Sequence, residues 1–309
     1  MKNTILHMKR ILAAALCVIA IFFSQTSVAQ QIPQFTQYMF NNYLSNPAVA
    51  GTYNYYQIRL NNRYQWVGMN DAPQTNSISF FGPLSKKDMG WGGYVYTDIT
   101  GPTSKMGLMG SYSYNMPLND DFRISGGLSF GLMQYKVDGS KLNLGENPDP
   151  SDPAIFKTSN STFTPDASIG FYLYNSDYQV GISAHQLFGQ KLKLYPDPIG
   201  TNRLKQHLLL SGSAMYSLSK DYRIEPAILL KYMFRSPFQF ELNAKVTYKS
   251  QMWGGLSYRF KDAISILIGY NYKKKYMIGY SYDYSYTGIR KYQSGTHEIM
   301  IGYLFDKIK

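Results

Sequence analysis

The stretch KYMIGYSYDYSYT, residues 275–287, decides the fold class of this chain. Its even-numbered positions hold five tyrosines and Ile278, whereas its odd-numbered positions from Gly279 to Ser285 are small or polar. Side chains alternate across a strand, so one face of this strand is aromatic and the other is not. A soluble sandwich would bury such a face against a second sheet, whereas a barrel in a membrane would turn it toward lipid. Tyrosine favours the second arrangement, because its ring suits apolar surroundings while its hydroxyl reaches the wet headgroup layer.

The composition agrees with a membrane barrel. The chain has 309 residues, of which 44% are hydrophobic and 16% aromatic, and yet its mean hydropathy is only -0.29. That length allows one large β domain or two ordinary ones. An aromatic excess with low hydropathy is unlike a helical membrane protein and suits a barrel in which only alternate residues meet lipid.

The N-terminus reads as a secretory signal peptide over residues 1–29. Three basic residues precede the apolar run Ile11–Phe23, and the small residues Ser27–Ala29 supply a cleavage site. The apolar run is shorter than the roughly 20 residues that a spanning helix needs. Cys17 is the only cysteine and lies within this run, so the mature chain is expected to hold no disulfide and no Cys-ligated metal.

The charge is basic but dispersed. The chain carries 31 basic and 19 acidic residues, which are scattered along strands and turns without a basic arm or stripe. This pattern, in an exported protein, argues against nucleic acid as a partner. A basic rim that meets lipopolysaccharide phosphates, or an anion-tolerant lumen, accounts for it better.

Residues 30–55 precede the alternating segments. Phe35, Tyr38, Met39 and Tyr43 recur at helical spacing, and Asn46-Pro47 would end a helix there. We therefore predict a short amphipathic helix followed by a loop. It would lie either in the lumen as a plug or in the periplasm as a contact.

Residues 56–309 read as an antiparallel transmembrane β-barrel of about 14 strands, an even number as expected for single-chain bacterial barrels. The predicted strands are Tyr56–Trp66, Asn76–Leu84, Trp91–Asp98, Ser104–Met116, Phe122–Lys136, Phe163–Asn175, Tyr178–Leu187, Lys205–Leu218, Arg223–Phe234, Phe238–Tyr248, Met252–Phe260, Ala263–Tyr272, Tyr276–Tyr286 and His297–Phe305. Charges such as Glu241 and Arg259 would be costly against lipid but can pair inside a lumen. Asp283 then points inward, and a charge is expected to impair assembly at Tyr280 or Tyr282 but to be tolerated at Ser281.

The connections between these strands alternate in length. Every second connection is short, and the opposite set contains every long one, as expected for short periplasmic turns and longer outside loops. The loops Val137–Thr162 and Phe188–Leu204 lack periodicity and are rich in turn residues. Structureless loops of that length are usually functional or disordered, so both are candidate contacts for a partner.

Nine positions are candidates for contact with a partner or for holding a plug. Arg63 and Gln65 would brace the lumen or plug, and Trp66 would anchor the membrane interface. The full set is Tyr38, Asn46, Pro47, Arg63, Gln65, Trp66, Asp149, Asp152 and Phe156.

The sequence predicts neither an enzyme nor a cofactor or metal site. His185, His207 and His297 fall on three different strands without a local ligand motif. A hydrolase that paired His297 with Glu298 is excluded, because neighbours on a strand point to opposite faces.

The chain resembles the PorP/SprF outer-membrane proteins of the type IX secretion system of Bacteroidetes. The resemblance rests on FTQYMFNNYLSNPAVAG (35–51), RYQWVGMNDAPQT (63–75), DITGPTS (98–104) and the closing motifs FQFELNA, GLSYRFKDAIS, IGYSYDYS and SGTHEIMIGY. It implies a non-enzymatic barrel in the outer membrane. Such a barrel would work with other components of that system and with secreted proteins that carry a C-terminal sorting domain. Some relatives look like core secretion components, and others pair with one large adhesin at the cell surface. A general diffusion porin is the alternative that the residues leave open.

Overall fold

The computed structural model describes residues 32–84, 88–142, 159–194, 203–234 and 236–307. The predicted signal peptide, residues 1–29, lies outside this range. So do three of the candidate contact positions, Asp149, Asp152 and Phe156.

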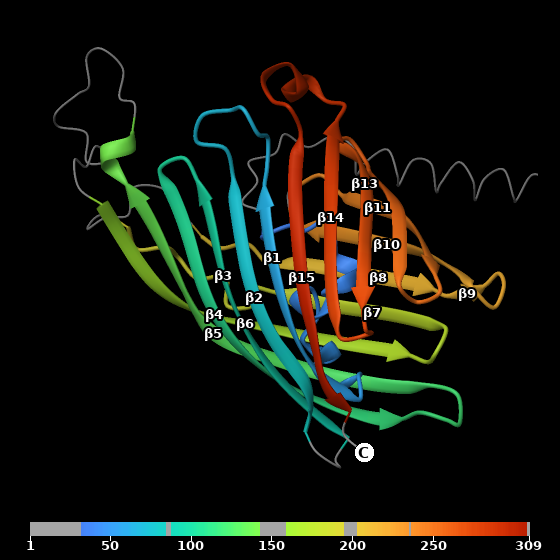
Figure 1. The fold of residues 1–309 in the computed structure, drawn as a ribbon. Coiled ribbons are helices and arrows are strands. Elements are labelled where there is room, and N and C mark those ends of the chain that lie inside the picture. Colours follow the sequence, from blue (N-terminus) through green and yellow to red (C-terminus); the bar gives the residue numbers. More distant parts are fainter. Residues whose placement is uncertain (1–31, 85–87, 143–158, 195–202, 235, 308–309) are drawn as a thin grey trace, which may run out of the picture.

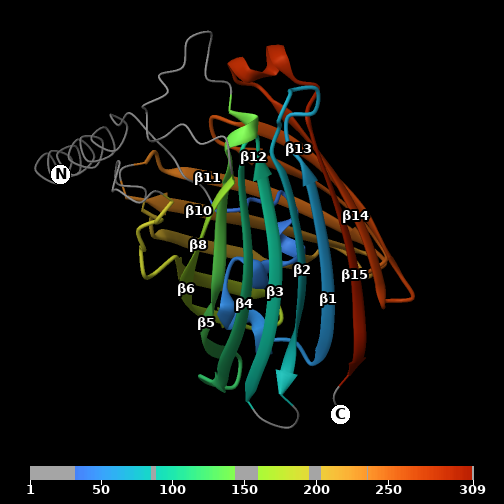
Figure 2. The same ribbon diagram turned by 90° about the vertical axis from the view of Figure 1, so that its left-hand side faces the viewer.

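The described residues form one antiparallel sheet that closes into a barrel (Figures 1 and 2). Neighbours in sequence pair throughout, β15 pairs with β1, and β10 pairs with β11, so that the ring is complete. The strands are β1 (Tyr55–Tyr64), β2 (Gln74–Leu84), β3 (Met89–Thr100), β4 (Thr103–Pro117), β5 (Arg123–Asp138), β6 (Ser159–Tyr174), β7 (Tyr178–His185), β8 (His207–Ala214), β9 (Tyr216–Ser217), β10 (Tyr222–Met233), β11 (Gln239–Tyr248), β12 (Met252–Arg259), β13 (Ala263–Tyr272), β14 (Tyr276–Ser285) and β15 (Thr296–Lys307).

The predicted strand number is confirmed. Of the fifteen strands within the described residues, β8 and the two-residue β9 both pair with β10 and are separated only by Met215, so they make one wall strand and leave fourteen. Each of the fourteen predicted segments overlaps one of these wall strands. Among the described residues the only helical elements are 3-10 turns, and none of them is long and apolar enough to cross a bilayer.

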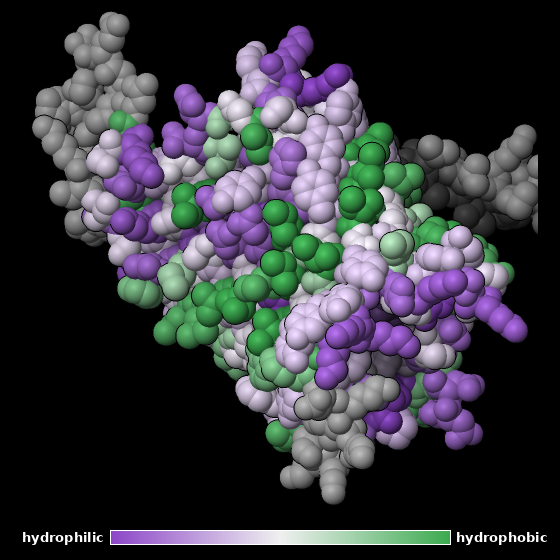
Figure 3. Space-filling view, in the orientation of Figure 1, coloured by the Kyte–Doolittle hydropathy of each residue, from purple (hydrophilic) through white to green (hydrophobic). Residues whose placement is uncertain are grey.

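Strand β14 shows the alternation that the tyrosine pattern predicts. Tyr276, Tyr280 and Tyr284 lie on the exposed outer face, while Asp283 and Ser281 are buried on the inner face. The outer face of the whole barrel is apolar in the same way, with Ile and Leu side chains from most strands roughly half exposed. Hydrophobic residues accordingly form a band across the face seen in Figure 3. This is the surface that lipid covers in a transmembrane barrel.

The two ends of the barrel differ in the length of their connections. At one end, here called the short-turn end, the connections have three to five residues, as in residues 175–177 and 118–122. The opposite, long-loop end carries residues 65–73, 139–158, 186–206 and 286–295, together with the 3-10 turns η4 (Gly139–Lys141) and η5 (Gly288–Tyr292). The C-terminal strand ends at the short-turn end (Figure 1).

The inner face of the barrel is packed rather than open, which changes one expectation. Ser281 is fully buried and pairs across the sheet with Glu298 on β15. A carboxylate at Ser281 would lie without water beside another carboxylate. The sequence-based expectation that Ser281 tolerates a charge assumed a wet lumen and is replaced by the opposite one.

We expect Ile301→Lys to destabilise the barrel. Ile301 is 49% exposed on the outer face of β15, between Leu60 and Ile278. A lysine near the middle of the bilayer costs about 2–4 kcal/mol. Urea unfolding in phospholipid vesicles measures this cost, and Ile301→Leu is the matched control. Equal midpoints for the two variants would mean that this face does not meet lipid.

Candidate functional site: the plugged lumen

The N-terminal segment lies inside the barrel (Figure 2). It forms three 3-10 turns, η1 (Tyr38–Phe40), η2 (Asn42–Leu44) and η3 (Pro47–Gly51), instead of the amphipathic helix that the sequence predicts. The apolar side chains with helical spacing contact different walls. Tyr38 packs with Leu209 and Leu229, whereas Tyr43 packs on Phe81. Because the barrel surrounds the segment, it needs no single apolar face. We call residues 32–52 the plug.

A cluster of buried charges joins the plug to the wall near its first residues. The Arg63 guanidinium lies 2.7 Å from an Asp283 carboxylate oxygen and 3.1 Å from a Glu298 oxygen. The Arg259 guanidinium lies 3.0 Å from Glu241 and 3.4 Å from the same oxygen of Asp283. All five side chains are at most 3% exposed. Buried charges of this kind are tolerated only when they are paired and hydrogen-bonded.

The plug completes this cluster. Three carboxylates face two guanidinium groups, and the backbone N–H groups of Thr36 and Gln37 donate to the two oxygens of Glu298, at 2.7 and 3.0 Å. The Thr36 hydroxyl accepts from Arg63 at 2.8 Å and lies 2.9 Å from both oxygens of Asp283. Hydrogen bonds to charged groups are about twice as strong as neutral ones. The first turn of the plug is therefore held by hydrogen bonds to buried carboxylates of the wall.

The end of the plug fits against wall positions that lack a side chain. The Asn46 carboxamide accepts from the Ala48 N–H at 2.9 Å and donates to the Phe171 carbonyl of β6 at 3.0 Å. A Cβ at Gly127 would lie 2.4 Å from the Ala48 nitrogen, and one at Gly170 would lie 2.0 Å from the Asn46 side-chain oxygen. These approaches leave no room for any other residue type.

Further polar contacts fix the middle of the plug. The Tyr43 hydroxyl donates to Ser111 at 2.8 Å, and the Tyr38 hydroxyl accepts from the Asn243 amide at 3.0 Å. Burial raises the pKa of Tyr38 well above its usual value, so the phenol stays neutral in the lumen. The Ser45 carbonyl lies 2.8 Å from His185 Nε2. A carbonyl only accepts, so this nitrogen carries the proton.

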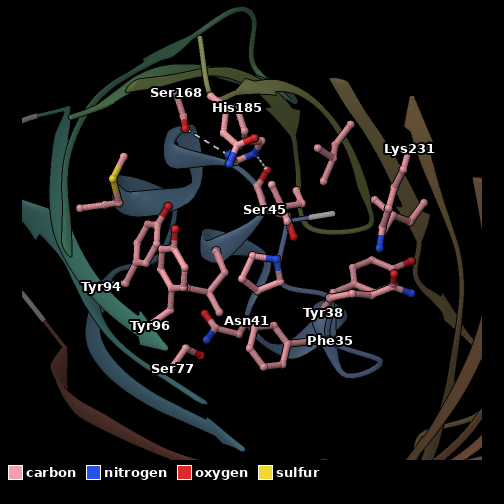
Figure 4. Close-up of a pocket in the computed structure, with 18 of the residues that line it drawn as sticks. Phe35, Tyr38, Asn41, Ser45, Ser77, Tyr94, Tyr96, Ser168, His185 and Lys231 are labelled. Atoms are coloured by element: carbon pink, nitrogen blue, oxygen red, sulfur yellow. Dashed lines mark hydrogen bonds between the residues drawn. The ribbon is translucent and has the colours of Figure 1, made fainter. Parts of the chain in front are cut away.

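Little space remains around the plug in the middle of the barrel. The cavity shown in Figure 4 has a volume of about 70 Å³ and lies between Phe35 and Tyr38 on the plug and Tyr94, Tyr96 and Lys231 on the wall. A cavity needs roughly 10–15 Å³ on this measure to hold one water, so this one has room for only a few.

A larger cavity lies at the short-turn end, on the opposite side of the plug from the charge cluster. Its volume is about 770 Å³, which is within the usual range for binding clefts. Tyr53 and Tyr172 line it, Lys245 pairs there with Glu225, and the turns that carry Asp120 and Asp177 form its rim. We call this cavity the vestibule.

The structure brings four of the predicted site residues together around the plug and separates others from it. Tyr38, Asn46 and Pro47 are buried plug residues, and Arg63 is the wall residue that binds Thr36. Gln65 and Trp66 lie in the first loop of the long-loop end, where the Trp66 N–H donates to the Thr296 hydroxyl at 3.1 Å.

Sequence reasoning missed two members of the site, Thr36 and Glu298. Glu298 lies on the inward face of β15, opposite His297, and its inward register was the signal that could have identified it. Thr36 carries no such signal, because its role depends on where the wall places Glu298 and Asp283. Within the described residues no group of His, Cys, Asp and Glu side chains is placed to hold a metal ion.

A closed barrel with an apolar outer belt and a lumen filled by its own N-terminal segment defines a plugged outer-membrane β-barrel. Comparison with known protein families identifies the family. The sequence model of the type IX secretion system membrane proteins PorP/SprF matches residues 27–303, and the chain belongs to that family. The protein is accordingly a non-enzymatic barrel of the outer membrane.

Solved structures agree on the fold. The toluene transporter TbuX of Ralstonia pickettii is 8% identical, with a TM-score of 0.50, over 85% of this chain and 92% of that one. The monoaromatic hydrocarbon channel TodX, in a mutant form, is 10% identical, with a TM-score of 0.51, over 93% of this chain and 98% of that one. Sequence identities this low show a shared fold and nothing about function. No curated protein matches the chain.

We expect Arg63→Gln to destabilise the barrel strongly. It leaves Asp283 and Glu298 buried with one guanidinium fewer, and breaking a buried pair in this way typically costs about 3–5 kcal/mol. Lys249→Gln is the control, since Lys249 pairs with Asp221 at an exposed site where an ion pair contributes little. Urea unfolding in vesicles compares the two variants. Equal losses would mean that the cluster does not hold the plug.

We expect Gly127→Ala to displace the plug while the barrel still forms, because the added Cβ collides with backbone atoms of Ala48. Gly110→Ala is the matched control, since its nearest neighbour would be the Phe130 carbonyl oxygen at 3.9 Å. Labelling of a cysteine placed at Ala48 by a water-soluble maleimide measures plug exposure. If the cysteine labels at the same rate in the Gly127→Ala and Gly110→Ala proteins, the close approach of Ala48 to Gly127 does not hold the plug in place.

Proposed function

We propose that this protein is a plugged scaffold of the type IX secretion system that binds, helps to secrete or anchors a secreted surface protein. The single observation that carries the proposal is the plug, which fills the middle of the lumen and is bonded to Glu298, Asp283 and the β6 backbone. A barrel whose lumen is occupied in this way works through its two ends. The partner would be a protein with a C-terminal sorting domain or a large adhesin, together with other components of the secretion system.

The long-loop end is the proposed contact for the secreted partner. By the length asymmetry of outer-membrane barrels, this end faces outside. Part of the loop Phe188–Leu204 folds inward, where Leu192, Leu194 and Leu204 pack on Met133. This packing fixes both bases of the loop to the barrel. The proposed contacts are the rest of this loop and the loop Val137–Thr162, with Asp149, Asp152 and Phe156.

The vestibule is the proposed contact for a component that approaches from the periplasm. It is concave, closed on its inner side by Tyr53 and Met39 of the N-terminal segment, and lined by tyrosines and charged groups. Aromatic and charged side chains in a recess are typical of sites where protein anchors bind.

Deleting the encoding gene is expected to remove one specific large surface protein from the cell. Surface biotinylation followed by mass spectrometry measures this loss, and complementation with the wild-type gene is the control for expression. If every sorting-domain protein still reaches and stays on the surface, the proposal fails.

The alternative function is that of a diffusion channel. What favours it is the fold, which this chain shares with proteins described as hydrocarbon channels and transporters. The plug argues against it, because ions would have to cross a region that leaves room for only a few waters. Purified protein in planar bilayers separates the two: we expect a silent barrel, and conductance only after residues 32–52 are deleted. Steady conductance of the intact protein would favour the channel.

A further inference from the structure

One buried carboxylate of the lumen lacks a basic partner among the described residues. Asp166 on β6 is 8% exposed and accepts a hydrogen bond from the N–H of its neighbour Ala167, at 2.7 Å. The other buried carboxylates of the described residues each pair with an arginine or a lysine, and these are Glu225, Glu241, Asp283 and Glu298. A buried carboxylate without a cation is costly. We therefore expect Asp166 to have a partner outside the described residues.

Asp166 lines the cavity of Figure 4, between the plug and the wall. On one side of this cavity lie the rings of Tyr94 and Tyr96, with their centroids 6.2 Å apart, and on the other side lies Lys231. Within the described part of the chain, Lys231 makes no ion pair with Asp166. A carboxylate and aromatic ring faces both attract cations. The cavity therefore suits a small cation on the side away from Lys231.

The described part of the plug begins at the same cavity. Ile32, Pro33 and Phe35 line it. Removal of the predicted signal peptide, residues 1–29, leaves only Gln30 and Gln31 ahead of Ile32. Two extended residues span at most about 7 Å, so cleavage places a new α-amine close to the cavity. This amine is mostly protonated at neutral pH, and the uncleaved chain does not have it.

We propose that the signal peptide is removed before Gln30 and that the α-ammonium group of the mature chain binds Asp166 inside the lumen. This occupant carries the charge that Asp166 lacks. It is small enough for a cavity of about 70 Å³ and is delivered there by the plug. Cleavage then completes the plug: its first turn is held by Glu298, and the end of the chain by Asp166.

An N-terminal glutamine reports directly on the state of its own amine. The free amine attacks the side-chain carboxamide carbon of the same residue, a C–N bond forms, ammonia leaves, and the chain then ends in a pyroglutamate ring. An ammonium group held by a carboxylate has no lone pair for this attack, so binding to Asp166 slows ring closure. Mass spectrometry of the N-terminal peptide detects the loss of ammonia. Cleavage one residue later leaves Gln31 first and gives the same readout.

The test compares rates of ring closure in folded protein purified from outer membranes in mild detergent. We expect Asp166→Asn to close the ring about tenfold faster than wild type, as on loss of a charge-assisted hydrogen bond. Asp98→Asn is the matched control, because Asp98 lies on the inward face of β3 and pairs with Lys105 at 4.0 Å. It removes the same charge from the lumen outside the proposed site, and we expect the wild-type rate. Wild type unfolded in urea supplies the rate of a free amine.

A further variant separates loss of charge from loss of folding. Asp166→Glu keeps the carboxylate, and we expect its rate to stay close to that of wild type. Resistance to SDS at room temperature shows that each variant is assembled. Several results overturn the proposal: equal rates for wild type and Asp166→Asn, the same acceleration in Asp98→Asn or Asp166→Glu, or closure in folded wild type as fast as in urea. A purified chain whose first residue is not glutamine overturns it as well.

Discussion

The structure depends on the neutralisation of buried charge inside the barrel. Asp283, Glu298 and Glu241 point into a lumen without bulk water, where Arg63 and Arg259 pair with them. The backbone N–H groups of Thr36 and Gln37 donate further hydrogen bonds to Glu298. Charges taken out of water are stable only with such partners. The wall and the plug therefore stabilise each other, although 262 residues separate Thr36 from Glu298.

The same constraint explains the distribution of small residues. A wall that accepts a close-packed segment must lose its own side chains where the backbone of that segment passes, and Gly127 and Gly170 are such positions. Larger inward residues such as Phe81 and Tyr172 surround Tyr43 and the residues after Pro47. The inner face is therefore shaped like a protein core, with packing in place of the polar, hydrated surface of an open pore.

The sequence predicts the wall much better than the plug, for a physical reason. Every strand of the wall has lipid on one side, and lipid is a uniform surrounding. The alternation of side chains in a run such as Tyr276–Tyr286 therefore indicates directly which residues face outward. The plug is surrounded by the wall, and the spacing of Phe35, Tyr38 and Tyr43 reflects contacts with opposite walls; helical periodicity was the wrong template for it. Arg63 could be placed in the lumen from its register alone. Its partner Thr36 could not, because their approach depends on the closed ring of strands.

Closing the lumen transfers function to the ends and the rim of the barrel. The middle is occupied by contacts that involve backbone atoms, such as those of Ala48 and Ser45, and movement of the plug would break bonds to several strands at once. Gradual loosening of the plug is therefore costly, and we expect the plug to stay fixed in the lumen. Next to a fixed plug, the inward-folded base of the loop Phe188–Leu204 and the tyrosine-lined vestibule are rigid recesses on the two sides of the membrane. Rigid recesses lower the entropic cost of binding another protein, which suits a scaffold better than a conduit.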